Sequence, residues 1–277
     1  MALYFTSINS GSNGNCYYVG NDQEAILVDV GLSCKEVEKR MDRLGLAINK
    51  IKAIFISHEH SDHIKGLAVF SKKYNLPVYI SEATLKSSRL PLNENNVFSL
   101  THLQSINIGK LKISAFSKFH DAADPYSFTI ECNNFRVGVF TDIGSVCDRL
   151  IHHFKSCHAA FLEANYDKEM LENGRYPYYL KRRITSGRGH LSNTEALNLF
   201  LNHKADYMSH LLLSHLSKDN NDPQLVEQLF KAAAGEMIVK VASRYEESEV
   251  YFVGDSNLVE KYHFDPSIYQ PEQLNLF

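Results

Sequence analysis

The part of the sequence best suited to chemistry is a histidine-rich turn that follows an apolar strand predicted over Ala53–Ser57. Directly after this strand come His58, His60, Asp62 and His63, in the spacing H-x-H-x-D-H. Imidazole and carboxylate groups crowded at a strand-to-helix turn suit a borderline divalent ion such as zinc or manganese. A polar, solvated turn is the alternative, but four ligand-type side chains within six positions favour a metal site.

The composition is that of an ordinary globular protein, with 277 residues of which 44% are hydrophobic and 22% charged. The formal net charge of -3 excludes a globally basic protein that wraps nucleic acid, so any nucleic-acid contact must come from a local patch. No apolar run reaches the roughly 20 residues of a membrane span, and the N-terminus lacks a signal-peptide pattern. We therefore expect a soluble, cytoplasmic protein with no membrane partner. The five cysteines form no C-x-x-C pair, so neither a disulfide framework nor a thiolate zinc site is expected.

About a dozen short β-rich runs are distributed along the chain, with helices between them. Because no Pro/Gly/Ser-rich linker divides the chain, we predict one α/β unit in which two sheets pack together with helices outside. The predicted strands are Ala2 to Ile8, Cys16 to Val19, Ala25 to Val30, Ala53 to Ser57, Val78 to Ser81, Leu111 to Phe116, Ser127 to Cys132, Arg136 to Thr141, Ala159 to Glu163, Leu211 to His215, Met237 to Val241 and Glu249 to Val253.

Three predicted helices begin with recognisable capping signals. Ser33 and Ser192 each open a capping box, and Asp222 precedes a first-turn proline, Pro223. The predicted inward faces are Val37, Met41 and Leu44 in the first helix, Ala196, Leu199 and Phe200 in the second, and Leu225, Leu229 and Phe230 in the third.

Together with the histidine-rich turn, four further segments resemble the motifs of the metallo-β-lactamase superfamily, and the resemblance extends nearly end to end. These segments are the strand around Asp29, the Phe-His-Asp-Ala run with His120, the strand end with Asp142 and the strand end with His215. The resemblance implies an α/β fold, an αβ/βα sandwich of two mixed sheets with helices on the outer faces. It also implies that Asp29 supports the ligand turn from behind.

The same resemblance implies that two divalent metal ions bind. The implied ligands are His58, His60 and His120 for one ion, and Asp62, His63 and His215 for the other. Asp142 would bridge the two ions, since each carboxylate oxygen can serve one cation. Zinc and manganese are the expected ions and iron is also compatible, because no thiolate biases the choice.

Hydrolysis is the expected chemistry, because two cations that share a water lower its pKa. Asp62 and His190 are the expected catalytic residues. His190 precedes the predicted helix start at Ser192, where free N–H groups and the helix dipole attract anions. We therefore predict that His190, Ser192 and Asn193 contact a phosphate and that His190 protonates a leaving alcohol. The alternative is a histidine that only helps to cap the helix.

A basic segment over residues 174–188 contains five basic residues, three tyrosines and no acid. Guanidinium and ammonium groups position phosphates, and tyrosine rings stack on exposed bases. The segment is therefore a candidate nucleic-acid surface, although a solvated charged face is the alternative. Its basic residues are Arg175, Lys181, Arg182, Arg183 and Arg188.

A narrower resemblance is to the WalJ/YycJ-like branch of the superfamily. It rests on the run Ser10 to Cys16, the Ser-His-Glu-His turn, the His-Asp-Ala run that begins at His120, the Gly-His-Leu-Ser-Asn turn around His190 and the Ser-His-Leu-Ser run around His215. This branch implies a DNA exonuclease of 5′ to 3′ polarity that acts in repair or replication. Two alternatives remain open: a small-molecule hydrolase of thioesters, lactones or cyclic phosphodiesters, and a binding module that uses metal only for structure.

The last residues form a predicted tail, 265–277, beyond a single hydrolase domain over 1–264. Its end resembles the bacterial sliding-clamp-binding pentapeptide in Gln273, Leu274, Leu276 and Phe277. Three apolar side chains are too few for a core, but they can fill a partner's apolar groove. A tail that folds back on its own domain is the alternative, and the sequence leaves the oligomeric state open.

Overall fold

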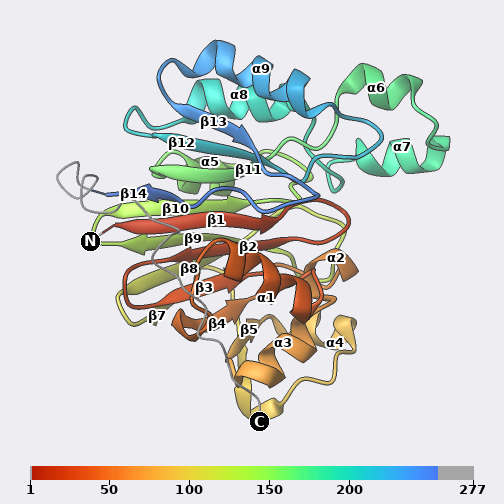
Figure 1. Ribbon diagram of the computed structural model, residues 1–277. Helices are drawn as coiled ribbons and strands as arrows, with labels where there is room; N and C mark the ends of the chain where they lie inside the picture. Colours follow the sequence, from red (N-terminus) through yellow and green to blue (C-terminus); the bar gives the residue numbers. More distant parts are fainter. Residues whose placement is uncertain (1, 255–277) are drawn as a thin grey trace, which may run out of the picture.

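The computed structural model describes residues 2–254, which form two mixed β-sheets packed face to face with helices on both outer surfaces (Figure 1). Within these residues each sheet has seven strands. The strand order is β14-β1-β2-β3-β4-β5-β6 in the first sheet and β13-β12-β11-β10-β9-β8-β7 in the second. The predicted αβ/βα sandwich is therefore confirmed.

The strands of the first sheet are β1 (Leu3–Asn9), β2 (Cys16–Gly20), β3 (Ala25–Val28), β4 (Ile51–Phe55), β5 (Val78–Ile80), β6 (Val97–Ser99) and β14 (Tyr251–Val253). Those of the second sheet are β7 (Ser105–Ile108), β8 (Leu111–Ser117), β9 (Tyr126–Cys132), β10 (Phe135–Phe140), β11 (Ala159–Glu163), β12 (His210–Ser214) and β13 (Ile238–Val241).

The α-helices over the first sheet and its connections are α1 (Cys34–Arg43), α2 (Ser61–Ile64), α3 (Leu67–Tyr74) and α4 (Glu82–Ser88). Those of the second half are α5 (Asp148–Phe154), α6 (Lys168–Asn173), α7 (Tyr178–Ile184), α8 (Asn193–His203) and α9 (Pro223–Ala234). Short 3-10 helices span Ile48–Lys50 and Glu94–Asn96. None of the helices in residues 2–254 has the length and apolar content needed to cross a membrane.

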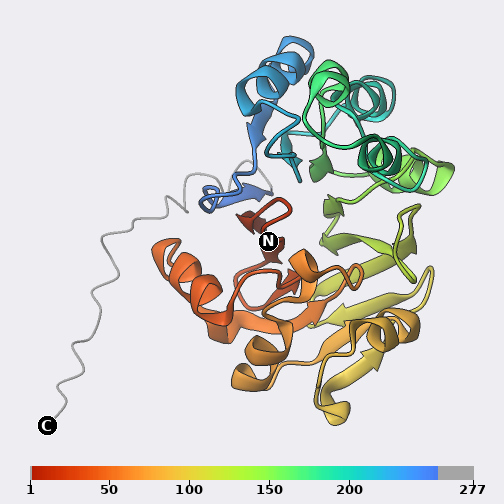
Figure 2. The ribbon, with the colours of Figure 1, turned by 90° about the vertical axis from the view of Figure 1, so that its right-hand side faces the viewer.

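The central apolar cluster lies between the two sheets. Phe5 and Phe55 of the first sheet meet Phe161 and Phe128 of the second edge to face, with ring centroids 5.9 and 5.8 Å apart. Separate clusters lie beneath the outer helices of each sheet, and Figure 2 shows the two halves one above the other. Because each sheet is buried on both faces, its strand ends are held at fixed positions.

Two strands were not predicted from the sequence, and two predicted strands, β3 and β14, are each two residues shorter in the structure. β6 and β7 are partly exposed along their length and lack a continuous apolar run, so the pattern of their side chains gave no signal. β3 ends at Val28 instead of Val30, because Asp29 has φ 62° and leaves the extended conformation. This departure turns the Asp29 side chain toward the histidine-rich turn.

The capping signals are confirmed for α8 and α9, but one box is incomplete. In α8, Ser192 and Glu195 bind each other's backbone amides, and in α9 the Asp222 carboxylate accepts two backbone N–H groups. In α1, Ser33 accepts from the amide of Glu36, but the Glu36 carboxylate binds Arg40 instead of returning to the cap.

The predicted inward face of α9 is partly wrong. Leu225 and Leu229 are 42% and 37% exposed, whereas Val226 and Phe230 are fully buried. The helix is rotated so that Val226 and Phe230, four residues apart, form the buried stripe.

Candidate metal centre

The predicted ligand residues meet at one edge of the sandwich, where parallel strands end. His58, His120, Asp142 and His215 lie just beyond β4, β8, β10 and β12. In the second sheet β10, β11 and β12 run parallel, so their carboxyl ends open on the same edge. Asp142 and His215 have φ values of 53° and 57°, the left-handed conformation that side chains other than glycine adopt at a cost. Strained backbone conformations of this kind are found more often at functional sites than elsewhere.

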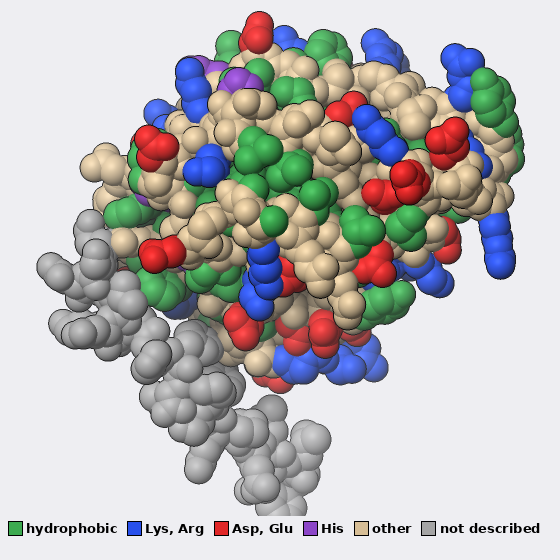
Figure 3. Space-filling model, turned by 90° about the horizontal axis from the view of Figure 1, so that it is seen from above, with side chains coloured by type: hydrophobic (Ala, Val, Ile, Leu, Met, Phe, Trp, Pro, Cys, Tyr) green, Lys and Arg blue, Asp and Glu red, His purple; other side chains and the backbone are tan. Residues whose placement is uncertain are grey.

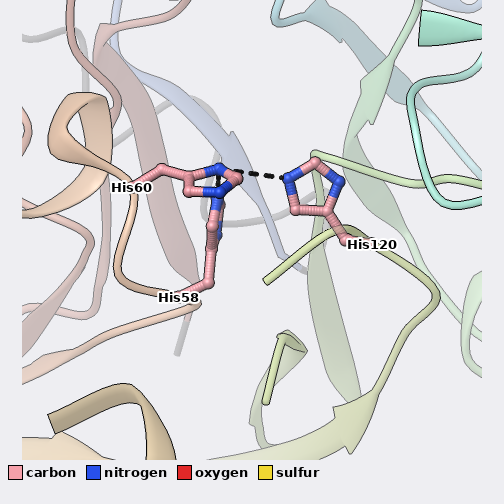
Figure 4. Close-up of side chains that lie close together, drawn as sticks. All are labelled: His58, His60 and His120. Atoms are coloured by element: carbon pink, nitrogen blue, oxygen red, sulfur yellow. Dashed lines mark hydrogen bonds between the residues drawn. The ribbon is translucent and has the colours of Figure 1, made fainter. Parts of the chain in front are cut away.

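The first group of ligand-type side chains is His58, His60 and His120, here called the first triad. Nδ1 of His60 lies 3.0 Å from Nε2 of His58 and 3.3 Å from Nε2 of His120 (Figure 4). Burial lowers the pKa of His58 well below its usual value and that of His120 to about 4. These two imidazoles are therefore neutral, the form in which a ring nitrogen can bind a cation.

The second group is Asp62, His63 and His215, here called the second triad. Nε2 of His63 and Nε2 of His215 lie 3.6 and 3.5 Å from Oδ2 of Asp62. Burial alone would lower the pKa of His63, but Asp142, Asp29 and Asp62 raise it to about 10. Neutral imidazoles do not balance the negative charge of these buried carboxylates. The pocket therefore favours a positive charge within it.

Asp142 lies between the two triads. Its Oδ2 is 3.2 Å from Nε2 of His63, and its Oδ1 is 3.7 Å from Nε2 of His120 and 3.5 Å from Nδ1 of His215. The Oδ2 atom is buried without a hydrogen-bond partner. A buried carboxylate oxygen without a donor, surrounded by imidazole nitrogens, fits a divalent cation.

Asp29 fixes the turn from beneath, as the resemblance implied. Its Oδ1 accepts from the amide of Ser57, and its Oδ2 lies 2.7 Å from both the Ser57 hydroxyl and Nδ1 of His63. Because Nδ1 of His63 is occupied by this contact, its Nε2 faces the other members of the second triad.

Glu163 is a buried residue of the site that sequence reasoning missed. Its Oε1 lies 2.8 Å from Nδ1 of His190 and 3.0 Å from Nδ1 of His215. Its Oε2 accepts from the amides of Ile143 and Leu191. Burial would raise the pKa of Glu163, but His190 and His215 lower it to about 2, so the group is a carboxylate. Its position as the last residue of a fully apolar strand was the available signal.

Lys118 is a second residue that the sequence did not point to. Although it is buried, its Nζ donates to the carbonyl of Thr141 at 2.6 Å, directly before Asp142. Burial lowers the pKa of Lys118, whereas the nearby carboxylates, Asp142 first, oppose that shift. The contact links the strand end before His120 to the strand end before Asp142.

His190 lies in the site, not in a helix cap. Its ring contacts Glu163 and lies 5.3 Å from the ring of His120 and 5.2 Å from that of His215, measured between centroids. The helix α8 begins after Ser192, so the alternative of a histidine that only caps the helix does not hold.

The prediction that Ser192 and Asn193 bind a phosphate is wrong. Both residues are buried, and their backbone amides already donate to Glu195 and to the carbonyl of Tyr166. The Asn193 side chain bonds Asn221. The donors expected to be free are therefore used within the protein.

The basic segment follows α6 and includes α7, and these two helices project from the sandwich in Figure 1. The Arg182 guanidinium lies over the Tyr178 ring, and Arg183 pairs with Asp121, the neighbour of His120. Arg175 and Arg188 are exposed on the same segment. Seen from above, basic and acidic side chains are mixed across the surface of the molecule (Figure 3), so this side presents no uniformly basic face.

Two mixed sheets with a His/Asp cluster at the strand ends define a protein of the metallo-hydrolase class, with a cluster suited to metal ions. A family model of the metallo-beta-lactamase superfamily matches residues 10–97. The exodeoxyribonuclease YycJ of Bacillus anthracis is 40% identical over 81% of this chain and 86% of its own length. The chain therefore belongs to the metallo-beta-lactamase superfamily, in the family of the YycJ and WalJ proteins.

Two further comparisons agree with this assignment. The exodeoxyribonuclease WalJ of Streptococcus pneumoniae is 31% identical over 83% of this chain and 90% of its own length. The metallo-beta-lactamase fold protein YhfI of Bacillus subtilis superposes with a TM-score of 0.71 and 19% identity, over 91% of this chain and 99% of that protein. At this identity the second likeness supports the fold alone.

Proposed function

We propose that this chain is a metal-dependent exodeoxyribonuclease that hydrolyses phosphodiester bonds of DNA. The observation that carries the proposal is the convergence of both triads on Asp142, whose buried Oδ2 has no hydrogen-bond donor. The names of the YycJ and WalJ relatives support a DNA substrate. A 5′ to 3′ direction and a role in repair or replication follow from the family resemblance and belong to the same proposal.

The first triad and the second triad are proposed to hold one divalent cation each, with Asp142 between them. Zinc or manganese fits these nitrogen and oxygen donors, and iron is also compatible. When bound, such cations lower the pKa of a water and stabilise negative charge on a phosphoryl group. Asp29 and Glu163 would keep His63 and His215 in the orientation that binding requires.

We propose that His190 donates a proton to the leaving group and that Asp62 accepts a proton from the attacking water. Glu163 holds Nδ1 of His190, which leaves Nε2 of that ring to give a proton to the leaving oxygen. The Asp62 side chain is 19% exposed, against 2% for Asp142, so it is the carboxylate that a water can reach. We assign to it the proton of the attacking water.

The connection through α6 and α7 is proposed to bind the DNA strand. Tyr178 and Tyr179 are 73% and 74% exposed, which suits stacking on unpaired bases. Lys181 and Arg182 contribute positive charge on the same helix, and Arg183 lies beside the centre through its contact with Asp121. Arg175 and Arg188 extend this charge along the connection.

The clamp-binding prediction concerns Gln273, Leu274, Leu276 and Phe277, which lie outside the described residues, as does the predicted domain boundary at 264. We propose that this segment docks in the apolar groove of a sliding clamp. Deleting residues 273–277 should abolish co-elution with purified clamp while the rate of DNA digestion without clamp stays the same. Co-elution that survives the deletion would contradict the proposal.

Digestion of end-labelled DNA duplexes tests the main proposal. We expect activity that a chelator abolishes and that zinc or manganese restores, with mononucleotides released first from the 5′ end. His58→Ala should be inactive at equal metal concentration. A metal-loaded protein that leaves DNA intact but hydrolyses a thioester, lactone or cyclic phosphodiester would overturn the proposal in favour of a small-molecule hydrolase.

A further inference from the structure

Arg183 differs from the other basic side chains of the segment 174–188, because a carboxylate holds it beside the metal centre. Its Nε donates to Oδ2 of Asp121, and Oδ1 of the same carboxylate lies 3.4 Å from Nε2 of His120. Burial would raise the pKa of Asp121, but the hydrogen bond from Arg183 lowers it, so the group is a carboxylate. One carboxylate therefore links the arginine to a candidate ligand of the first triad.

The backbone fixes the end of α7 at the same place. The carbonyl of Ile184, the residue after Arg183, accepts from the backbone amide of His190 at 2.9 Å. The carbonyl of Gly189 lies 3.1 Å from Nδ1 of His120. A Cβ at Gly189 would come within 2.1 Å of the Ile184 carbonyl oxygen, so glycine is required for this close approach. The end of α7 is thus tied to a histidine of the first triad and to the proposed proton donor.

The guanidinium of Arg183 keeps two groups of donors for a further partner. Its side chain is 54% exposed, and within residues 2–254 neither Nη nitrogen has a hydrogen-bond or ion-pair partner. The hydrogen bond to Asp121 raises the pKa of Arg183 most, and the charge of Asp62 in the second triad adds to this shift. The free donors are therefore held beside the centre, within electrostatic reach of both triads.

Lys181 and Arg182 of the same helix have other partners. Nζ of Lys181 donates to the carbonyl of Glu172 at 2.6 Å. The Arg182 guanidinium lies over the Tyr178 ring and donates to its hydroxyl. These contacts do not involve the metal centre, so the two side chains suit a general attraction for a DNA backbone, whereas Arg183 has a defined position beside the candidate ligands.

We propose that Arg183 is a catalytic residue whose Nη groups donate to the phosphoryl group that is cut, and that Asp121 is the positioning residue that holds it there. The inference rests on the proposed function. Negative charge develops on the phosphoryl oxygens as the phosphodiester bond breaks, and the two parallel donors of a guanidinium match two of these oxygens. Because Asp121 fixes the guanidinium beforehand, Arg183 should lower the barrier to cleavage more than it strengthens DNA binding.

Single-turnover cleavage of end-labelled DNA by the metal-loaded protein tests this inference, with DNA binding measured separately by fluorescence anisotropy in a chelator. Arg183→Gln should lower the rate at saturating DNA by about 10²-fold or more, the typical cost of removing one donor to a developing oxyanion. The dissociation constant of DNA should rise by a smaller factor, and the zinc content should stay the same. A natural cleavage rate in Arg183→Gln would overturn the inference.

Arg136→Gln is the matched control, since it also removes a partly exposed arginine held by a carboxylate. Arg136 pairs with Glu131 at the start of β10, whereas Asp142 follows the end of that strand, about 20 Å away. Its cleavage rate should stay at the natural value. A loss as large as that of Arg183→Gln would reflect a general effect of lost charge and would contradict a catalytic role.

Chemical rescue separates a lost donor from a disturbed fold. Guanidinium chloride should restore part of the lost rate of Arg183→Ala, because the free ion can occupy the space beside Asp121. Sodium chloride at the same concentration should not raise the rate, and neither salt should raise that of Arg136→Ala. Equal effects of the two salts on Arg183→Ala would speak against a donor role.

A double variant tests the role of Asp121. Asp121→Ala should slow cleavage by about 10- to 100-fold. Combined with Arg183→Gln it should be no slower than Arg183→Gln alone, because a positioning residue acts only through the group that it holds. Additive losses, or loss of zinc from Asp121→Ala, would overturn this role. A natural protein that binds metal but leaves DNA intact contradicts the proposed function itself, whereas natural cleavage that does not depend on Arg183 contradicts this inference alone.

Discussion

The two halves of the molecule supply the candidate metal centre in different ways. The first half contributes His58, His60, Asp62 and His63 from one turn after β4. The second half contributes His120, Asp142, Glu163, His190 and His215, which lie at separate strand ends and loops. The first contribution is local and depends on a single turn held by Asp29. The second exists only when β8, β10, β11 and β12 are assembled in one sheet.

This difference separates two tasks within the site, the binding of metal ions and the transfer of protons. The turn of the first half places four candidate ligands close together in the chain and is held by Asp29. The second half adds the carboxylate between the triads, and it adds Glu163 and His190, to which we assign the holding and transfer of protons. Variants of second-half residues should therefore show distinct defects, whereas the four ligands of the turn share one support.

Asp142→Ala should have the largest effect, because this carboxylate contacts histidines of both triads. Loss of several kcal/mol of charge stabilisation corresponds to a rate at least about 10³-fold lower. Zinc binding at both sites should weaken together, as chelator competition can measure. Asp148→Ala, an exposed carboxylate of the same half, should change neither quantity. A variant that loses only one ion would show that Asp142 does not lie between both.

His190→Ala should come next and should separate proton transfer from metal binding. A positioned general acid contributes about 10²- to 10⁴-fold to a rate. We expect a fall of that size in single-turnover DNA cleavage with the zinc content unchanged, because His190 belongs to neither triad. His152→Ala, an exposed histidine of α5, serves as the control. Loss of zinc in His190→Ala would make the residue a ligand instead.

Glu163→Gln should have a smaller effect, and it should reduce both metal binding and proton transfer. Glutamine keeps the size of the side chain and one carbonyl oxygen, but it loses the charge that faces His190 and His215. Groups of this kind contribute about 10- to 100-fold to metal affinity or activity. Zinc affinity of the second triad and the cleavage rate should both fall, while the first triad keeps its affinity. An unchanged second triad would limit Glu163 to its contact with His190.

The sequence was sufficient to predict the fold class, most strands and seven candidate ligand residues that the structure brings together. The turn at 58–63 could be found because its ligands are adjacent in the chain. Glu163 and Lys118 were missed because each is a single charged residue in or after an apolar strand, and only the assembled sheet brings it to the site. Ser192 and Asn193 were misjudged because a helix start looks open in a sequence, whereas Glu195 and Tyr166 already bind its amides.

The smallest effect is expected outside both halves of the centre, on the projecting helix α7. Lys181→Ala combined with Arg182→Ala should weaken DNA binding and reduce the slope of log affinity against log salt by about 1 to 2, one step for each lost phosphate contact. The zinc content and the cleavage rate at saturating DNA should stay the same, because neither side chain reaches the triads.

Lys35→Ala combined with Lys39→Ala is the matched control for α7, since it removes the same charge from the exposed face of α1. A DNA surface on α7 requires that the first pair alone change the salt slope, as fluorescence anisotropy with labelled DNA can measure. If both pairs weaken binding equally, the effect is that of net charge, and the basic segment is a solvated face. If neither pair does, the strand reaches the centre along another surface, and the role assigned to α7 is wrong.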